Sequence, residues 1–376
     1  MPQMAAGSHS LEVVTFVVEN GTVVESGRSA ALRVTVTGAT ASGPSSPPAP
    51  ALPLSTKLIA TSDGAELRAD VIADQLTAPT SLATSPDGRV FVAEREGRIR
   101  IIRGGALEAQ PAITIYDALA TAAGDGGLVG IALDREFEQT HFLYAVYTVS
   151  APEATRVFRV VRYREVDGRL GERIVILDGV AAAARPAAAI DIGPDGNLYI
   201  AFDAGQGAGR VASASYSGKV LRLSPDGTTP RDQAGGPVLA SDFVSPRGLD
   251  WNPETGTLWV VDAKTRDAEE LRIVGARGSS PTPGRARLPL PAGMGASALA
   301  FYRGTLIPAF AGNVFVAAGD GQYLLRLRVD ARDPSKVTFN ERLLTDLGSR
   351  IRAVATSNDG VVFVATERSV LRMGPR

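Results

Sequence analysis

Residues 85–102 read SPDGRVFVAEREGRIRII, which is a turn followed by two short strands of alternating apolar residues. The Asp-Gly pair suits a tight hairpin, because glycine accepts the positive backbone angles that such turns need. Stretches of the same design recur, with turns that begin near Pro86, Asp134, Pro194, Asn252, Tyr302 and Asn358. Successive turns are therefore 48, 60, 58, 50 and 56 residues apart.

A repeat of this kind predicts a β-propeller. Each unit is a sheet of about four strands that cannot bury both faces alone, and radial packing of the units covers them. Six units predict six blades, in an all-β fold. The segment at 57–76 is expected to add an outer strand to the last blade and so close the ring. Helical periodicity is absent elsewhere, and residues 106–123 are the one place where a short helix is expected.

The chain ahead of the propeller differs in character. Residues 1–10 are small and polar, which predicts disorder. Residues 11–38 alternate like strands, with turn signals at Asn20-Gly21 and Ser26-Gly27, and predict a short β-rich extension. They resemble the opening strands of a Calx-beta domain. Residues 39–56 form a Pro/Ser/Ala-rich linker, and the six-bladed propeller is expected over 57–376.

Composition excludes several classes of function. The net charge of −1 provides no electrostatic footprint for nucleic acid. The absence of cysteine excludes disulfides, thiolate metal sites and cysteine nucleophiles. No apolar run approaches the ~20 residues that span a bilayer. The start, MPQMAAGSHS, lacks the basic and apolar regions of a signal peptide, so none is expected.

Six segments, in chain order, resemble motifs of the glucose/sorbosone dehydrogenase family. They are GDGGLVGIALDREFEQTHFLYAVYT at 124–148, IDIGPDGNLYIAFD at 190–203, GKVLRLSPDGTTP at 218–230, SPRGLDWNPETGTLWVVD at 245–262, ALAFYRGTLIPAFAGNVFVA at 298–317 and RIRAVATSNDGVVFVAT at 350–366. The resemblance implies a six-bladed propeller that binds pyrroloquinoline quinone (PQQ) and calcium and oxidises aldose sugars or related alcohols. It also favours a periplasmic or extracellular location.

The family's catalytic base is a histidine, and this chain lacks it. The matching position holds Arg185, whose guanidinium stays protonated and does not act as a base at neutral pH. His9 falls in the polar start, and His141 falls in a turn of the second blade, where it is expected to be solvated. No catalytic residue is therefore assigned.

The cofactor positions are altered as well. Arg350 and Arg352 match the family's R-x-R, which pairs with the cofactor carboxylates, although exposed arginines are the alternative. Asp125 replaces a family glutamine and is a further candidate at the cofactor, although its negative charge would repel a ligand with three carboxylates. In the segment Val244-Ser245-Pro246-Arg247-Gly248 the family's arginine has become valine, and Arg247 stands at another register.

The calcium loop keeps acidic residues but not its Gly-Pro turn. Asp262 and Glu269 are the candidate metal ligands, because calcium prefers carboxylate oxygens. Lys264 and Arg266 add positive charge between them, and a solvated charged loop is the alternative. PQQ and calcium are thus expected only if the family's site survives.

Three functions follow from these residues. The first is a propeller that has lost quinone-dependent sugar oxidation and binds a sugar-like small molecule or a protein partner. The second is an active PQQ-dependent aldose or alcohol dehydrogenase with a base other than histidine. The third is a calcium-dependent lactonase, which needs converging Glu, Asn and Asp side chains that the sequence does not reveal.

Overall fold

The computed structural model describes residues 7–12, 16–19, 22–25, 28–36, 55–120, 125–152, 155–205, 215–265, 268–274, 287–330, 332–334 and 336–376. The chain divides into two compact units, Met1–Ala49 and Pro50–Arg376. No helix in the described ranges has the length and apolar character needed to cross a membrane.

The smaller unit contains two antiparallel strand pairs. Strand β1 (Gly7–Leu11) pairs with β4 (Leu32–Val36), and β2 (Phe16–Glu19) pairs with β3 (Thr22–Glu25). Residues 7–10, which the sequence assigned to a disordered start, therefore form part of a strand. The predicted turn dipeptides at 20–21 and 26–27 lie outside the described residues.

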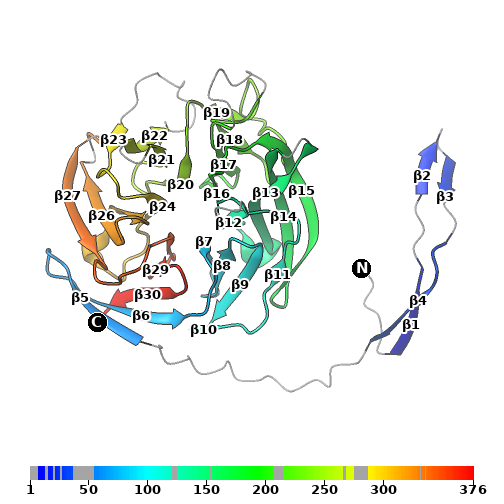
Figure 1. The fold of residues 1–376 in the computed structure, drawn as a ribbon, viewed down its shortest axis with the longest axis horizontal. Helices are drawn as coiled ribbons and strands as arrows, with labels where there is room; N and C mark the ends of the chain where they lie inside the picture. The colour runs from blue at the N-terminus through cyan, green and yellow to red at the C-terminus, as the bar shows by residue number, and fades with distance from the viewer. Residues whose placement is uncertain are drawn as a thin grey trace. The chain divides into compact units, whose positions relative to one another are not determined.

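The larger unit is a six-bladed β-propeller, as predicted (Figure 1). From the central channel outward, the first three blades are β7 (Pro79–Thr84), β8 (Val90–Glu94), β9 (Arg98–Arg103) and β10 (Ala106–Leu107), with β11 (Ile113–Thr114) also on β9; β12 (Leu128–Leu133), β13 (Phe142–Ser150), β14 (Arg156–Val166) and β15 (Arg169–Ala181); and β16 (Ala188–Ile192), β17 (Leu198–Phe202), β18 (Val220–Leu223) and β19 (Val238–Ala240).

The last three blades follow the same order. They are β20 (Pro246–Trp251), β21 (Leu258–Thr265), β22 (Ala268–Val274) and β23 (Arg287–Pro289); β24 (Ala296–Phe301), β25 (Asn313–Ala318), β26 (Tyr323–Val329) and β27 (Val337–Leu343); and β28 (Ala353–Thr356), β29 (Val362–Ala365), β30 (Val370–Pro375), β6 (Glu66–Ala73) and β5 (Ser55–Ala60). Each of the six predicted turns joins the first two strands of one blade.

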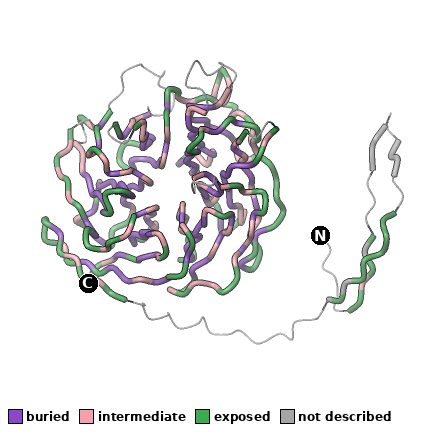
Figure 2. The backbone as a smooth tube through the Cα atoms, viewed as in Figure 1, coloured by how far each residue is buried: buried purple, intermediate pink, exposed green. Residues whose placement is uncertain are grey.

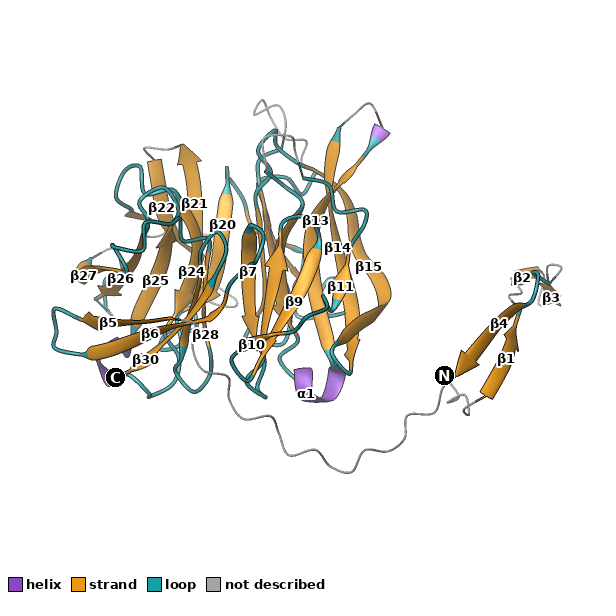
Figure 3. Ribbon diagram, turned by 60° about the horizontal axis from the view of Figure 1, so that its bottom comes forward, coloured by secondary structure: helices purple, strands orange, loops and turns teal. Residues whose placement is uncertain are grey.

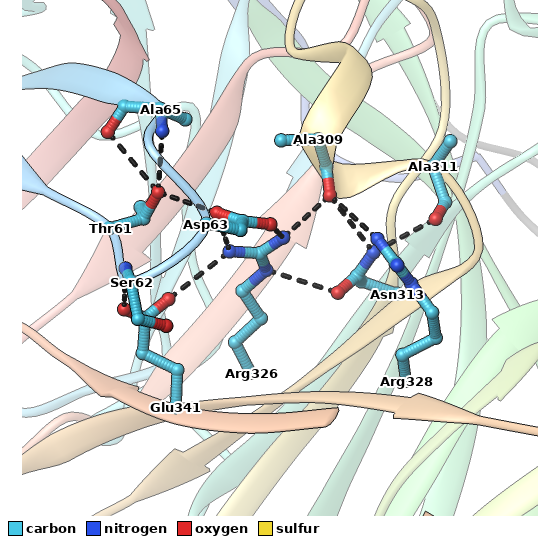
Figure 4. A network of polar contacts seen from close by, with 10 residues as sticks. All are labelled: Thr61, Ser62, Asp63, Ala65, Ala309, Ala311, Asn313, Arg326, Arg328 and Glu341. Atoms are coloured by element: carbon cyan, nitrogen blue, oxygen red, sulfur yellow. Dashed lines mark hydrogen bonds and ion pairs between the residues drawn. The ribbon is translucent and has the colours of Figure 1, made fainter. Parts of the chain in front are cut away.

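The ring closes where the sequence predicted. Strand β6, from the start of this unit, pairs with β30 near the C-terminus, and β5 adds one strand more (Figure 1). The β5–β6 turn also reaches blade 5, where Asp63 accepts hydrogen bonds from Arg326 at 2.6 and 3.0 Å (Figure 4). Residues 263 positions apart are thus joined across the seam.

The core lies in layers between neighbouring blades. In one layer Phe91 and Ile99 of blade 1 pack with Leu143 and Tyr147 of blade 2, all fully buried. The inner strands of neighbouring blades also contact one another around the whole ring. At Gly248 a side-chain Cβ would lie 2.6 Å from the backbone nitrogen of Leu299, so only glycine lets β20 and β24 approach so closely. Figure 2 shows buried backbone inside the ring and exposed backbone on its rim.

The helix expected at 106–123 is absent from the described part of that segment. Residues 106–107 and 113–114 are short strands instead, and Ala112 and Ile115 are buried in the core between blades 1 and 2. Tertiary burial overrides the local pattern here. The propeller's short helix α1 (Phe137–Thr140) lies instead in the turn between β12 and β13 (Figure 3).

Candidate functional site

A charged cavity of about 640 Å³ opens at the end of the channel where the inner strands begin. We call it the upper cavity. Pro79, Ala188, Ala296 and the segment before β28 contribute the starts of inner strands, and loops that follow the second strands complete the wall. The charged side chains that line it are Arg95, Asp125, Arg185, Arg247, Lys264, Glu269, Asp320, Arg350 and Arg352.

Basic side chains outnumber acidic ones in this lining. Among its described residues, six are arginine or lysine and three are aspartate or glutamate. A concave wall with this balance concentrates positive potential, since low-dielectric surroundings focus the field. The upper cavity therefore favours an anionic ligand.

Arg185 and Asp125 face each other in the wall. The Nε of Arg185 donates a hydrogen bond to Oδ2 of Asp125 at 3.2 Å. The arginine side chain is 82% exposed, whereas that of Asp125 is 22% exposed. The two positions that the resemblance gives to histidine and glutamine thus hold an ion pair, which is one joint change in the chemistry of the site.

Arg350 and Arg352 both line the upper cavity. Arg350 pairs with Asp320 at 3.1 Å, and Arg352 donates to Glu367 at 2.6 Å. The Nε of Arg352 is buried without a hydrogen-bond partner. Their position agrees with a role toward an anion, and cofactor binding itself stays a prediction.

Asp262 has structural partners. Its carboxylate is fully buried within β21 and accepts backbone N–H bonds from Val244 and Ser245 at 2.8–3.2 Å. Arg272 approaches it to 3.4 Å. Asp203 holds Ala183 and Ala187 in the same way on the neighbouring blade. An acid at the end of a second strand therefore anchors the loop that enters the blade.

Glu269, the other predicted metal ligand, lies across the ladder of the same blade. It is buried, accepts the backbone N–H of Ala296 at 3.2 Å, and lines the upper cavity. Burial raises the pKa of its carboxyl above the usual range, and the charge of Asp320 adds to this. Asp262 therefore binds the loop that enters blade 4, and Glu269 binds the start of blade 5. That the two carboxylates share a metal ion stays a prediction.

Sequence reasoning missed two arginines. Arg95 follows strand β8 in the upper cavity, where burial and then the charge of Arg352 lower the pKa of its guanidinium. Arg247 was set aside because of its register, yet it lines the same cavity from strand β20. The feature of the sequence that could have pointed to Arg95 is its place directly after the apolar strand at 90–94.

The described side chains suit a polycarboxylate better than a calcium ion. For a polycarboxylate the wall offers several guanidinium groups. For calcium, no group of three or more acidic or histidine side chains with metal-binding geometry occurs in the described ranges. The segment that resembles the family's calcium loop belongs to two paired strands, in which Ala263 pairs with Glu269.

His141 takes no part in the upper cavity. It ends helix α1 with a left-handed backbone (φ 54°), and its side chain is 44% exposed. Its Nδ1 lies 3.7 Å from the Glu165 carboxylate. The exposure agrees with the expectation of a solvated turn residue.

Comparison with known proteins agrees with this architecture. The family model described as Glucose / Sorbosone dehydrogenase matches residues 76–279 and 287–372. The aldose sugar dehydrogenase YliI of Escherichia coli is 25% identical over 83% of this chain and 94% of its own.

Solved structures show the same fold. A putative oxidoreductase (glucose dehydrogenase) of Thermus thermophilus is 30% identical, with a TM-score of 0.69 over 82% of this chain and 99% of its own. The PQQ-bound aldose sugar dehydrogenase of Streptomyces coelicolor is 20% identical, with a TM-score of 0.68 over 87% of this chain and 100% of its own. With its six blades, its motif order and this match over most of the propeller, the chain belongs to the glucose/sorbosone dehydrogenase family.

Proposed function

We propose that the propeller binds an anionic small molecule of the PQQ type in its upper cavity and has lost the histidine-based oxidation of sugars. The observation that carries this proposal is a basic cavity whose base position is Arg185, paired with Asp125. A protonated guanidinium binds anions but accepts no proton at neutral pH. The protein then acts as a binding module on a dehydrogenase scaffold.

The arginines of the wall carry the binding role. Arg350 and Arg352 approach from the start of the last blade and Arg95 from blade 1, so a flat ligand with several carboxylates meets guanidinium groups from neighbouring blades. PQQ, when bound, supplies a quinone that accepts hydride. The relative from Streptomyces coelicolor has been solved with PQQ bound, which supports the choice of this ligand.

A second candidate is an active dehydrogenase with a base other than histidine. Asp125 favours it, because this carboxylate lines the cavity beside Arg185. A carboxylate within reach of the substrate hydroxyl can take up its proton. The Asp125 position would then supply the base that position 185 no longer holds.

Calorimetric titration with PQQ, with and without calcium, tests the binding proposal. We expect micromolar binding that calcium leaves unchanged, and at least a 10-fold loss of affinity in Arg352→Gln. The matched control is Arg231→Gln, an exposed arginine outside both cavities. Absence of binding by the unaltered protein at high PQQ concentration contradicts the proposal.

Turnover separates the two candidates. The PQQ-loaded protein is assayed with a panel of aldoses and an artificial electron acceptor. The binding-module proposal expects no turnover above that of free PQQ. Turnover that disappears in Asp125→Asn while PQQ affinity stays the same establishes the active dehydrogenase instead.

A further inference from the structure

Arg247 lies at the neck of the central channel. A second cavity of about 430 Å³, the lower cavity, occupies the channel toward the turns at Pro86, Pro194 and Asn358. Four residues line both cavities, namely Thr80, Val129, Ala188 and Arg247. The other three are small or apolar, so the guanidinium of Arg247 is the charged group where the cavities meet.

The guanidinium of Arg247 lacks a hydrogen bond or ion pair with any described residue. Other arginines of the interior differ from it. Arg222 is paired with Asp195 and Asp232, and Arg303 with Asp250. Arg247 is half-buried where the two cavities meet, and this partial burial lowers the pKa of its guanidinium. A guanidinium that has no hydrogen-bond acceptor among the described residues is suited to bind an anion from outside the chain.

The carboxylates nearest to Arg247 leave its N–H donors unused. The negative charges of Asp125, Asp203 and Glu269 raise the pKa of Arg247, and the positive charge of Arg185 lowers it. None of the three carboxylates forms an ion pair with it, and two of them already accept backbone N–H bonds. A carboxylate that entered the upper cavity would therefore meet donors that the chain itself does not use.

We propose that Arg247 binds a carboxylate of the ligand from the floor of the upper cavity and fixes how deep the ligand sits. This rests on the proposed function, and it names the ligand class as a flat molecule with at least one carboxylate pointing down the channel. The planar guanidinium fork matches a carboxylate with two parallel hydrogen bonds. Arg247 thereby replaces, from another register, the arginine that the family resemblance places at position 244.

The test compares Arg247→Gln and Arg247→Lys with the surface control Arg231→Gln. The two probes are PQQ and citrate, which both carry three carboxylates, and affinities are measured by calorimetry at two salt concentrations. We expect Arg247→Gln to weaken PQQ 10- to 100-fold and to reduce the salt dependence, Arg247→Lys to lose less, and the control to match the unaltered protein. Unchanged melting temperatures establish that the variants are folded.

The possible results distinguish the role of Arg247 from the proposed function. If the protein binds PQQ and Arg247→Gln binds it equally well, the floor role is wrong while the proposed function stands. If citrate binds through Arg247 and PQQ does not bind, the anion site stands and the quinone proposal fails. If neither probe binds the unaltered protein, both proposals are overturned.

Discussion

The contact between Asp63 and Arg326 should carry a measurable share of the propeller's stability. Arg326 on strand β26 is fully buried, and each of its five N–H groups has an acceptor (Figure 4). Two N–H groups bind Asp63, and the others bind Glu341, Asn313 and the carbonyl of Ala309 at 2.5–3.1 Å. Substituting Asp63 by alanine removes two charge-assisted bonds at the seam of the ring.

Two considerations set the expected cost. The Arg326 guanidinium lowers the pKa of Asp63 from 3.8 to about 2, which corresponds to roughly 2.5 kcal/mol of stabilisation. Charged hydrogen bonds contribute about 1.5–3 kcal/mol each, and Arg326 keeps its other partners in the variant. We therefore expect Asp63→Ala to lower the free energy of unfolding by about 2–3 kcal/mol at pH 7.

Urea denaturation followed by tryptophan fluorescence measures this loss. The matched control is Asp359→Ala, because Asp359 accepts a similar hydroxyl bond from Ser357 in a turn of the same kind but pairs with no arginine. The folded-state pKa of Asp63 is depressed, so its contribution is complete above about pH 4 and is lost as the pH falls through about 2. A loss within 1 kcal/mol of the control, or one that does not shrink in acid, would refute the reasoning.

Three further predictions concern the channel and its loops. Burial and the charge of Asp250 raise the pKa of Asp191, so the free energy of unfolding should fall as the pH rises from 4 toward 7, and denaturation of Asp191→Asn should not show this fall. Asp262→Ala leaves the N–H groups of the loop before β20 unpaired and should lower the free energy of unfolding by about 2–3 kcal/mol. Calcium should leave the melting temperature of the unaltered protein unchanged. An upward shift with calcium that Asp262→Ala abolishes would show that Asp262 is a calcium ligand. Gly248→Ala overpacks β20 against Leu299 and should cost about 1–3 kcal/mol, and an unchanged denaturation midpoint would contradict the close packing.

The fold could be predicted because its signals are local. Turn residues such as Asp87-Gly88 and the alternating strands after them recur six times, and each copy alone indicates a hairpin. The closing strand followed from the same logic, since residues 57–76 read as strand without a blade of their own. The expected helix at 106–123 failed because burial between two blades decides that segment, and burial is not a local property.

The sequence by itself determined the propeller, the family and the arginine at position 185, where the resemblance places a histidine. It also proposed Arg350 and Arg352 for the cofactor site, because they match the family's R-x-R, and both line the upper cavity. Only the tertiary structure decided what the other charges do. Asp262 anchors a loop, and Arg247 stands without a partner at the neck of the channel.

The physical reason is that a charged side chain takes its role from its neighbours. In a propeller those neighbours come from blades far apart in the chain, as Arg185 and Asp125 do, and Arg326 and Asp63 do across the whole ring. Spacing along one strand shows which way a residue points. The packing of the blades around the ring decides whether that residue contacts a carboxylate or lines a cavity.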